Sequence, residues 1–334
     1  MTTLLTGGAG YIGSHCAWAF EDHKRPFVVV DDLSRGHRHL MPQKAPFYQG
    51  KAEDTALFGQ MVEKHGIDTV IHLAGSTVVA ESCQDPGAYF YNNTSVSLAV
   101  MQACLRYGVN NIIFSSSASV YGHNPKHLVC EDEPVNPQSP YADSKWMTEC
   151  MLNAFHKAHG MNIVSLRYFN VAGADPHGRT GQHVPNATHL VQSALDVALG
   201  YKKALHIFGT DYNTPDGTGM RDYIHVSDLA EAHVCALDFL HKQATPSYQV
   251  FNCGYGTGYS VRDVIRAVEA VTGTKLPVHE APRRSGDPEA LMADATRFRQ
   301  QTTWRPRFDN LETVIRTALA WEKAKGEHNH EHVS

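Results

Sequence analysis

The sequence predicts an α/β protein with a doubly wound parallel sheet and a smaller C-terminal lobe. In the first half of the chain, short apolar runs rich in β-branched residues alternate with longer amphipathic stretches. The apolar runs are continuous, which is typical of parallel strands covered by helices on both faces. In the second half, Gly, Pro and Asn gather in loops between the apolar segments. A chain of 334 residues also favours a main domain with an attached lobe over one small core.

The elements of the first half follow from these two alternating patterns. The runs that we expect to be strands are Thr2–Thr6, Phe27–Val30, Thr69–Leu73, Asn111–Ser115 and Ile163–Tyr168. The stretches that we expect to be helices are Tyr11–Phe20, Thr55–His65, Tyr89–Arg106 and Pro140–Ala158. Parallel strands need crossover connections of this length, so the pattern indicates repeated strand–helix–strand units.

The second half has fewer regular elements and a different arrangement. We expect helices at His189–Leu199, Ser227–Leu240 and Leu311–Lys323, a helix capped by Ser260, and strands at Leu205–Phe208 and Gln249–Cys253. Residues 1–170 are expected to form the sheet domain, with a later segment of about 222–254 returning to it. Residues 171–326 are expected to form mainly the second lobe, and the polar tail 327–334 to be disordered.

Composition excludes several classes of function. The net charge is −5, whereas nucleic-acid binding needs a basic face. No apolar stretch reaches the roughly 20 residues that span a membrane. The seven cysteines show no CxxC spacing and lie mostly in apolar runs, as in a reducing compartment. The N-terminus enters a strand-like run at once, without the pattern of a signal peptide. We therefore expect a cytoplasmic protein without nucleic-acid or membrane partners and without a metal site.

A glycine-rich turn after the first strand indicates a dinucleotide site. Gly7, Gly10 and Gly13, with Tyr11 and Ile12 between the last two, follow a GxxGxxG spacing at the start of the first helix. Glycines at these places allow a tight turn, close approach of a pyrophosphate and close packing of helix on strand, which predicts a Rossmann-type domain. Asp31 ends the second strand, where a carboxylate binds ribose hydroxyls and favours NAD over NADP. At this point Asp31 can also be interpreted as a simple turn residue.

A tyrosine, a lysine and a serine form the candidate catalytic group. Tyr141 and Lys145 have i, i+4 spacing on an expected helix, which puts both side chains on one face. An ammonium group beside a phenol favours the phenolate and lowers its pKa, so Tyr141 can act as a general base. Ser117 follows the strand Asn111–Ser115, at the carboxyl end where parallel sheets bind ligands. Each feature alone has an ordinary interpretation, as a surface pair or a polar loop.

Six motifs together resemble one enzyme family. They are TGGAGYIGSH, IFSSSASVYG, SPYADSKWMTE, LRYFNVAGA, GTGMRDYIHVSDLA and APRRSGD, which run in order from Thr6 to Asp287. In this order they resemble the UDP-glucose (UDP-galactose) 4-epimerases of the extended short-chain dehydrogenase/reductase family. The resemblance implies an isomerase that inverts C4 of a UDP-sugar through a transient 4-keto intermediate, with tightly held NAD.

The resemblance also implies roles for individual residues. Tyr141 would take the proton of the sugar 4-hydroxyl, Ser117 would bond the same oxygen, and Lys145 would bind the nicotinamide ribose. The residues that would bind the UDP-sugar are Asn170, Leu190, Phe208, Arg221, Arg284 and Asp287. Family members are usually homodimers, often through helices equivalent to Tyr89–Tyr107 and Tyr141–Ala158.

Three positions depart from the family pattern. Lys51 stands where an Asp usually binds the adenine amino group, which leaves backbone, Glu53 or Asp54 for that role. Thr77 replaces a lysine that contacts the cofactor, so weaker NAD retention is expected. Leu291 lies where a tyrosine often bounds the sugar pocket in enzymes restricted to UDP-glucose and UDP-galactose.

Several alternative activities share this fold. A UDP-xylose/UDP-arabinose or UDP-N-acetylhexosamine 4-epimerase is the nearest alternative. A sugar-nucleotide dehydratase or decarboxylase needs a carboxylate after the serine, whereas Ser117 is followed by Ala118 and Ser119. A non-catalytic NAD-sensing regulator would typically have lost Tyr141 or Lys145.

Overall fold

A seven-stranded parallel sheet forms the centre of the main domain. The computed structural model describes residues 1–183, 188–284 and 286–331. The strands of this sheet are β1 (Thr2–Thr6), β2 (Phe27–Asp31), β3 (Phe47–Gln49), β4 (Ile67–His72), β5 (Asn111–Ser117), β7 (Asn162–Tyr168) and β11 (Tyr248–Cys253). Their order is β11-β7-β5-β4-β1-β2-β3, and every pairing is parallel. The order reverses between β1 and β4, and ligands of such sheets bind at this switch point.

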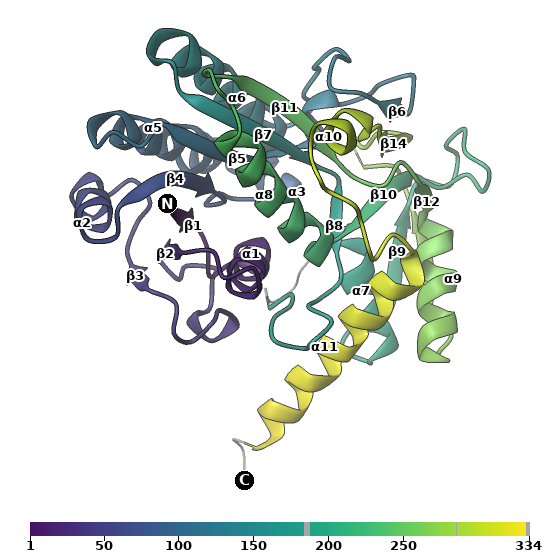
Figure 1. Ribbon diagram of the computed structural model, residues 1–334. Helices are drawn as coiled ribbons and strands as arrows, with labels where there is room; N and C mark the ends of the chain where they lie inside the picture. The colour runs from purple at the N-terminus through teal and green to yellow at the C-terminus, as the bar shows by residue number, and fades with distance from the viewer. Residues whose placement is uncertain (184–187, 285, 332–334) are drawn as a thin grey trace.

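Helices cover both faces of this sheet (Figure 1). One face carries α2 (Thr55–His65), α5 (Val96–Arg106) and α6 (Pro140–His159), and the other carries α1 (Tyr11–Asp22) and α8 (Val226–His241). Neighbouring residues of each strand therefore enter different cores. In β1, for example, Leu4 packs in one core and Leu5 in the other, and both are fully buried. Burial on both faces explains the continuous apolar strands and confirms the predicted fold class.

Helix α2 begins and ends at capping residues. Asp54 accepts hydrogen bonds from the backbone N–H groups of Ala56 and Leu57 at 3.0 Å and starts α2, and Gly66 ends it with φ +61°.

The single helix expected over Tyr89–Arg106 is wrong in detail. The chain instead forms α3 (Val79–Gln84), α4 (Pro86–Tyr89), a π-helical turn over Phe90–Ser95, and then α5.

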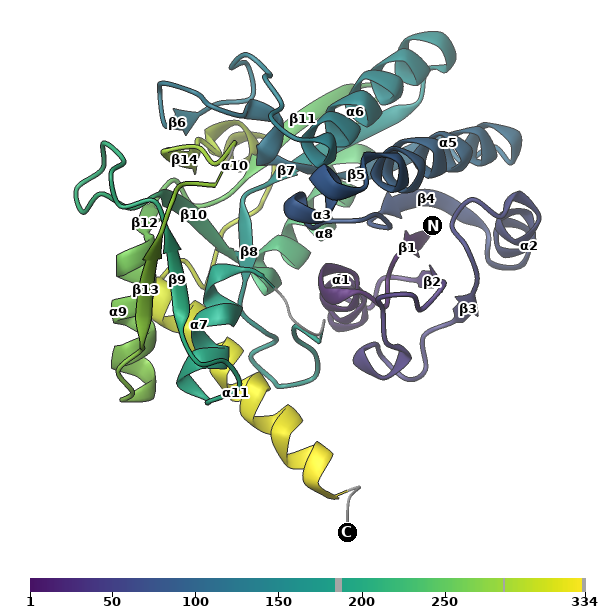
Figure 2. The same cartoon turned by 180° about the vertical axis from the view of Figure 1, so that it is seen from behind.

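The second lobe contains smaller sheets covered by helices (Figure 2). Strand β10 (Met220–His225) pairs in parallel with β8 (Asn170–Ala172) and β14 (Ala290–Ala293), and antiparallel with β12 (Gly258–Ser260). The remaining described elements of this lobe are β6 (Leu128–Val129), β9 (Leu205–Phe208), β13 (Val278–Ala281), α7 (Leu190–Ala198), α9 (Val261–Thr272), α10 (Thr296–Gln301) and α11 (Leu311–Glu331). Ser260 caps α9 as expected, in a reciprocal capping box with Asp263.

Two segments differ from the expected boundaries. Within the segment of about 222–254, β11 joins the main sheet and α8 packs on α1, but β10 belongs to the second lobe because its partners β8 and β14 lie there. Helix α11 continues to Glu331 instead of ending at Lys323, so the first part of the expected disordered tail has helical backbone. Residues 332–334 lie outside the described part of the chain.

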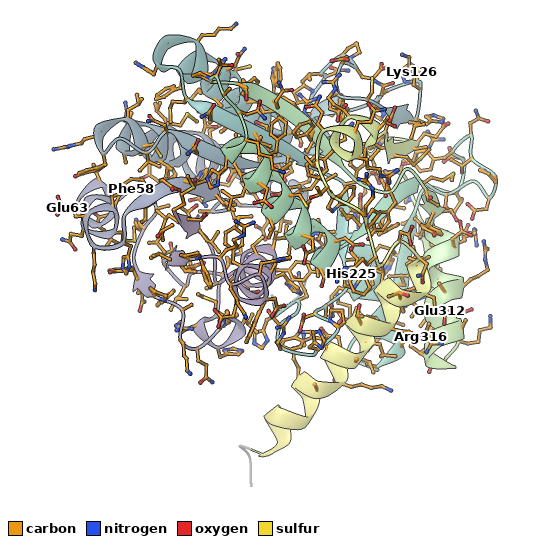
Figure 3. The ribbon with its side chains drawn as sticks, viewed as in Figure 1. Phe58, Glu63, Lys126, His225, Glu312 and Arg316 are labelled. Atoms are coloured by element: carbon orange, nitrogen blue, oxygen red, sulfur yellow. The ribbon has the colours of Figure 1, made fainter. Side chains whose placement is uncertain are left out.

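The second lobe is tied to the main domain through buried polar contacts. His225, labelled in Figure 3, is the last residue of β10 and the N-cap of α8, which packs on α1 of the main domain; its Nε2 is 3.0 Å from Thr317 Oγ1 on α11. Tyr11 Oη on α1 donates to the carbonyl of Gly173 at 2.7 Å. In residues 1–183, 188–284 and 286–331, no helix is both long and apolar enough to cross a bilayer.

Candidate active site

The glycine-rich turn lies at the switch point of the main sheet. Gly7 has φ +69°, and a Cβ there would meet the backbone nitrogen of Ala74, which follows β4, at 2.7 Å. A Cβ on Gly13 would lie 2.2 Å from the carbonyl oxygen of Gly7, so the helix can approach the turn only with glycine. Gly10 differs, because its Cβ would meet only Gly7 O, at 3.4 Å. The protein leaves space over Gly10, as the approach of a pyrophosphate requires.

The first turn of α1 provides the donors for such a group. Gly10 is the N-cap of α1, and no side chain caps the free N–H groups there. Free N–H groups and the positive end of the helix dipole fit a pyrophosphate. Tyr11 and Ile12 belong to this turn, but their side chains have other partners: the Tyr11 hydroxyl bonds Gly173 O, and Ile12 packs against the core. These two residues can contribute their backbone to a cofactor.

The carboxylate of Asp31 holds the glycine-rich turn. Its Oδ2 accepts the Ala9 N–H at 2.9 Å, and its Oδ1 accepts the Leu33 N–H at 2.8 Å. Burial raises the pKa of this carboxyl, and the two backbone bonds oppose that shift. Each oxygen keeps a free lone pair, so the carboxylate can also accept ribose hydroxyls. The donors of the turn and the acceptors of Asp31 together fit a dinucleotide such as NAD.

Lys145 points from α6 to the end of β5. Its Nζ donates to the carbonyl of Ser115 at 2.8 Å and lies 5.9 Å from the centre of the Tyr141 ring. A Cβ on Gly75, after β4, would lie 3.7 Å from this nitrogen. The side chain is buried, and burial lowers the pKa of Lys145 to about 8. Because one of its three donors is used, two remain for a ligand.

Tyr141 and Ser117 lie within hydrogen-bonding distance of each other, and the pKa of Tyr141 differs from the expected one. Burial raises the pKa of Tyr141, and a side-chain hydrogen bond with Ser117 lowers it. The expectation that Lys145 lowers the pKa of Tyr141 is wrong, because burial has the larger effect and Lys145 Nζ donates to Ser115 O. Ser117 Oγ accepts bonds from Ser119 N at 3.2 Å and Ser119 Oγ at 2.9 Å. Its own proton is therefore free for donation to the phenol oxygen.

The predicted diphosphate residues pair with each other in the second lobe. Arg221 on β10 and Asp287 form a hydrogen-bonded ion pair between Nη2 and Oδ1. Arg221 Nη1 also donates to Met220 O at 2.7 Å. Leu291 on β14 stands opposite Arg221 in the parallel register. Asp287 thus orients the guanidinium, and ribose binding by its carboxylate remains a prediction.

Arg284 and Phe208 form a second contact of the predicted site. The Arg284 guanidinium carbon lies 3.7 Å from the centre of the Phe208 ring, so the cation stacks on the aromatic face. Leu190 begins α7 and packs against the core of the second lobe. Asn170 is exposed on β8 opposite Tyr223 of β10. Strands β8 and β10 are thus neighbours, but no hydrogen bond joins Asn170 directly to Arg284.

The departures from the family pattern have definite surroundings. Lys51 and Thr77 are both exposed. Asp54 uses one carboxylate oxygen, Oδ1, to cap α2, so both Glu53 and the second oxygen of Asp54 remain expected acceptors for the adenine amino group. Leu291 is 6% exposed and packs in a small core that includes Ala118, the residue after Ser117. Position 291 therefore lies in the core beside the turn that follows Ser117.

Sequence reasoning missed Asn93, which joins the segment after β4 to α6, the helix that carries Tyr141 and Lys145. Its Oδ1 accepts the Ser76 N–H at 2.7 Å, and its Nδ2 donates to Ser76 O at 3.0 Å and Ser144 Oγ at 3.0 Å. Asn93 lies in the π-helical turn, which places its side chain toward these partners. An asparagine inside an apolar helical pattern was the available signal, since such a residue usually needs buried partners.

Comparisons with known proteins agree with this geometry. Residues 3–254 match the model of the NAD dependent epimerase/dehydratase family. A UDP-glucose 4-epimerase from Azospirillum brasilense is 50% identical over 321 residues, which cover 96% of this chain and 92% of the relative.

Two solved structures are similar over both lobes. The UDP-glucose 4-epimerase from Bifidobacterium longum, in complex with NAD+ and UDP, has a TM-score of 0.92 and 34% identity, covering 98% of this chain and 99% of that one. The UDP-glucose-4-epimerase from Stenotrophomonas maltophila, with bound NAD and formylated UDP-arabinopyranose, has a TM-score of 0.94 and 35% identity, with the same coverage.

Proposed function

The chain belongs to the NAD dependent epimerase/dehydratase family and has the activity of an NAD-dependent UDP-glucose 4-epimerase, and we propose that Tyr141, Ser117 and Lys145 carry its proton chemistry. The observation that supports these roles is the meeting of the three side chains at the carboxyl end of β5, beside the glycine-rich turn. When bound, NAD supplies reversible hydride transfer at C4 of the sugar, so the cycle is redox-neutral.

Tyr141 takes the proton from the 4-hydroxyl and later returns it. The acceptor positions of the Ser117 hydroxyl are used by Ser119. When the sugar is bound, this hydroxyl donates to the sugar 4-oxygen, which carries the developing negative charge. A positioned general base of this kind contributes on the order of 10²–10⁴-fold. Lys145 uses its two free donors for the nicotinamide ribose and keeps a positive charge near the phenol. The transient 4-keto sugar then turns in the pocket before its other face is reduced.

The second lobe holds the UDP part of the substrate. Arg221 and Arg284 bind diphosphate oxygens, because a guanidinium group matches phosphate with paired donors. Phe208 and Leu190 support the uracil. Asp287 binds the uridine ribose while it orients Arg221. Asn170 reaches the diphosphate or sugar from β8, and Leu291 bounds the sugar pocket beside Ala118.

Exposed apolar side chains and free thiols support a proposal for the protein's assembly and location. We propose a cytoplasmic homodimer. Tyr91, on the π-helical turn, and Met147, on α6, are 58% and 45% exposed, as suits a helix-mediated contact between two copies. All seven cysteines are free thiols, which fits a reducing compartment.

Turnover of a panel of UDP-sugars tests the proposal. The purified protein is incubated with UDP-galactose, UDP-xylose and UDP-N-acetylgalactosamine, and the products are separated by chromatography. We expect UDP-galactose and UDP-glucose to interconvert in both directions, and Tyr141→Phe to abolish most of the turnover while UDP binding persists. Accumulation of an oxidised sugar with stoichiometric consumption of NAD would contradict the assignment.

A further inference from the structure

One buried network crosses three neighbouring strands of the main sheet at a single level. Ser116 of β5 is in register with Arg167 of β7, and Arg167 is in register with Asn252 of β11. In-register neighbours of parallel strands point to the same face. The exposed fractions of the three residues are 1%, 3% and 0%, so their polar groups depend on partners inside the protein.

The partner on the covering helix is Glu149. It follows Tyr141 and Lys145 on α6 at steps of four residues, which places it along the same side of the helix. Glu149 Oε1 accepts the Ser116 hydroxyl at 2.5 Å and Arg167 Nε at 3.0 Å, and Oε2 accepts Arg167 Nη2 at 2.7 Å. The catalytic helix is thus joined to the residue immediately before Ser117.

The same arginine also holds the segment after Ser117. Ser117 begins a 3₁₀ turn that ends at Tyr121. Arg167 Nη1 donates to the Tyr121 hydroxyl at 2.9 Å, and that hydroxyl donates to Asn252 Oδ1 at 2.7 Å. Side-chain hydroxyls on both sides of Ser117 are therefore bonded to one ion pair: Ser116 bonds Glu149, and Tyr121 bonds Arg167.

Stability alone gives a weak reason for such a pair. Taking a carboxylate and a guanidinium out of water costs several kcal/mol per ion. Well-packed apolar residues of similar volume often stabilise the folded protein equally well. Catalysis gives a stronger reason, since a misplacement of about 1 Å of a reacting group can cost roughly 10²-fold. The bonds of Glu149 and Arg167 fix the distance between the helix that carries Tyr141 and the turn that carries Ser117.

We propose that Glu149 and Arg167 are positioning residues for epimerisation, which hold the Ser117 turn against the catalytic helix through Ser116 and Tyr121. This inference rests on the proposed roles of Ser117 and Tyr141. It also makes a quantitative prediction. If the Glu149–Arg167 pair acts through Ser117, removal of the pair cannot lower kcat more than removal of the Ser117 hydroxyl does.

A double-mutant cycle tests this prediction. Ser116→Ala and Glu149→Gln are each made alone and in a Ser117→Ala background, and kcat, KM and the melting temperature are measured with UDP-galactose. We expect kcat to fall by about 10-fold for Ser116→Ala and by up to about 10²-fold for Glu149→Gln, with KM nearly unchanged. In the Ser117→Ala background both effects should shrink to within about twofold. Ser116→Thr, which keeps the hydroxyl, should restore turnover.

Asp228→Asn is the matched control for a lost buried carboxylate. Asp228 is 1% exposed and accepts bonds from Tyr255 Oη and from the backbone of Arg307 and Phe308, remote from the network. This variant should lower the melting temperature and leave kcat of the folded enzyme unchanged. If Glu149→Gln does not fold, Ser116→Ala and Tyr121→Phe, which each remove one hydroxyl, complete the cycle.

The outcomes separate this inference from the proposed function. Equal losses of kcat in both backgrounds, or unchanged kcat in all variants of the network, would overturn the positioning role. Wild-type turnover in Tyr141→Phe and Ser117→Ala would instead overturn the proposed proton chemistry, and the positioning role with it.

Discussion

Replacement of Gly10 by alanine separates cofactor binding from folding. Gly10 has φ −74° and ψ 178°, a conformation that alanine adopts without strain, and the nearest atom to its Cβ would be 3.4 Å away. The folded protein should therefore accept the methyl group, with a gain of about 0.4–1 kcal/mol from the stiffer unfolded chain. The same methyl group occupies the space that a pyrophosphate needs for close approach to the N–H groups of α1. Each charge-assisted hydrogen bond lost costs about 1.5–3 kcal/mol, which is roughly 10- to 150-fold in affinity.

The assay measures NAD and stability in parallel. NAD released by denaturation of the purified protein gives the retained fraction, titration calorimetry gives the affinity, and scanning calorimetry gives the melting temperature. Gly10→Ala should lose most of its NAD while melting no lower than the NAD-free wild type. Gly87→Ala is the control, because its Cβ would lie 3.6 Å from Asp85 Oδ1, on an exposed helix. Retention of NAD by Gly10→Ala at the wild-type level would show that the pyrophosphate does not approach Gly10.

Three further predictions concern the chemistry, the sugar pocket and acid stability. Tyr141→Phe should lower kcat by on the order of 10²–10⁴-fold with little change in UDP affinity by calorimetry; turnover near the wild-type rate at every pH would refute the assignment. Leu291→Tyr should selectively lower kcat/KM for UDP-N-acetylgalactosamine relative to UDP-galactose, because position 291 packs beside the Ser117 turn; an equal change for both sugars would contradict a size filter. Burial lowers the pKa of His72 and of His225 to about 3, whereas histidines in the unfolded chain titrate near 6.5. The unfolded state then binds more protons below that pH, so the melting temperature should fall steadily from pH 6.5 to 4, and a constant value would contradict this linkage.

Local patterns predicted the elements well where local interactions decide them. Continuous apolar runs predicted the strands of the main sheet except the short edge strand β3, and Asp54 and Ser260 mark helix starts by direct capping bonds. The helix expected over Tyr89–Arg106 shows the limit of this reasoning. Asn93 bonds Ser76 and Ser144, far away in the sequence, and the π-helical turn serves contacts that no local pattern contains.

The candidate site depends even more on long-range contacts. The i, i+4 spacing places Tyr141 and Lys145 on one face of α6, but the Lys145 ammonium bonds Ser115 O, and only the folded sheet brings that carbonyl within reach. Arg221 and Asp287 are 66 residues apart and meet because β10 and β14 are neighbours. The sequence alone gives no reason to bring Arg221 and Asp287 together. Only the resemblance of the six ordered motifs to a known family indicated that both residues bind the same ligand.

Transfer of a deuterium label at C4 is the most direct test of the central claim. The purified protein, without added NAD, is incubated with UDP-galactose deuterated at C4, and the UDP-glucose formed is examined by NMR and mass spectrometry. Oxidation and reduction within one closed pocket predict that the deuterium stays at C4 of the product, with no net change in the bound cofactor. Loss of the deuterium to water, or no UDP-glucose at all, would contradict a 4-epimerase that uses its own NAD.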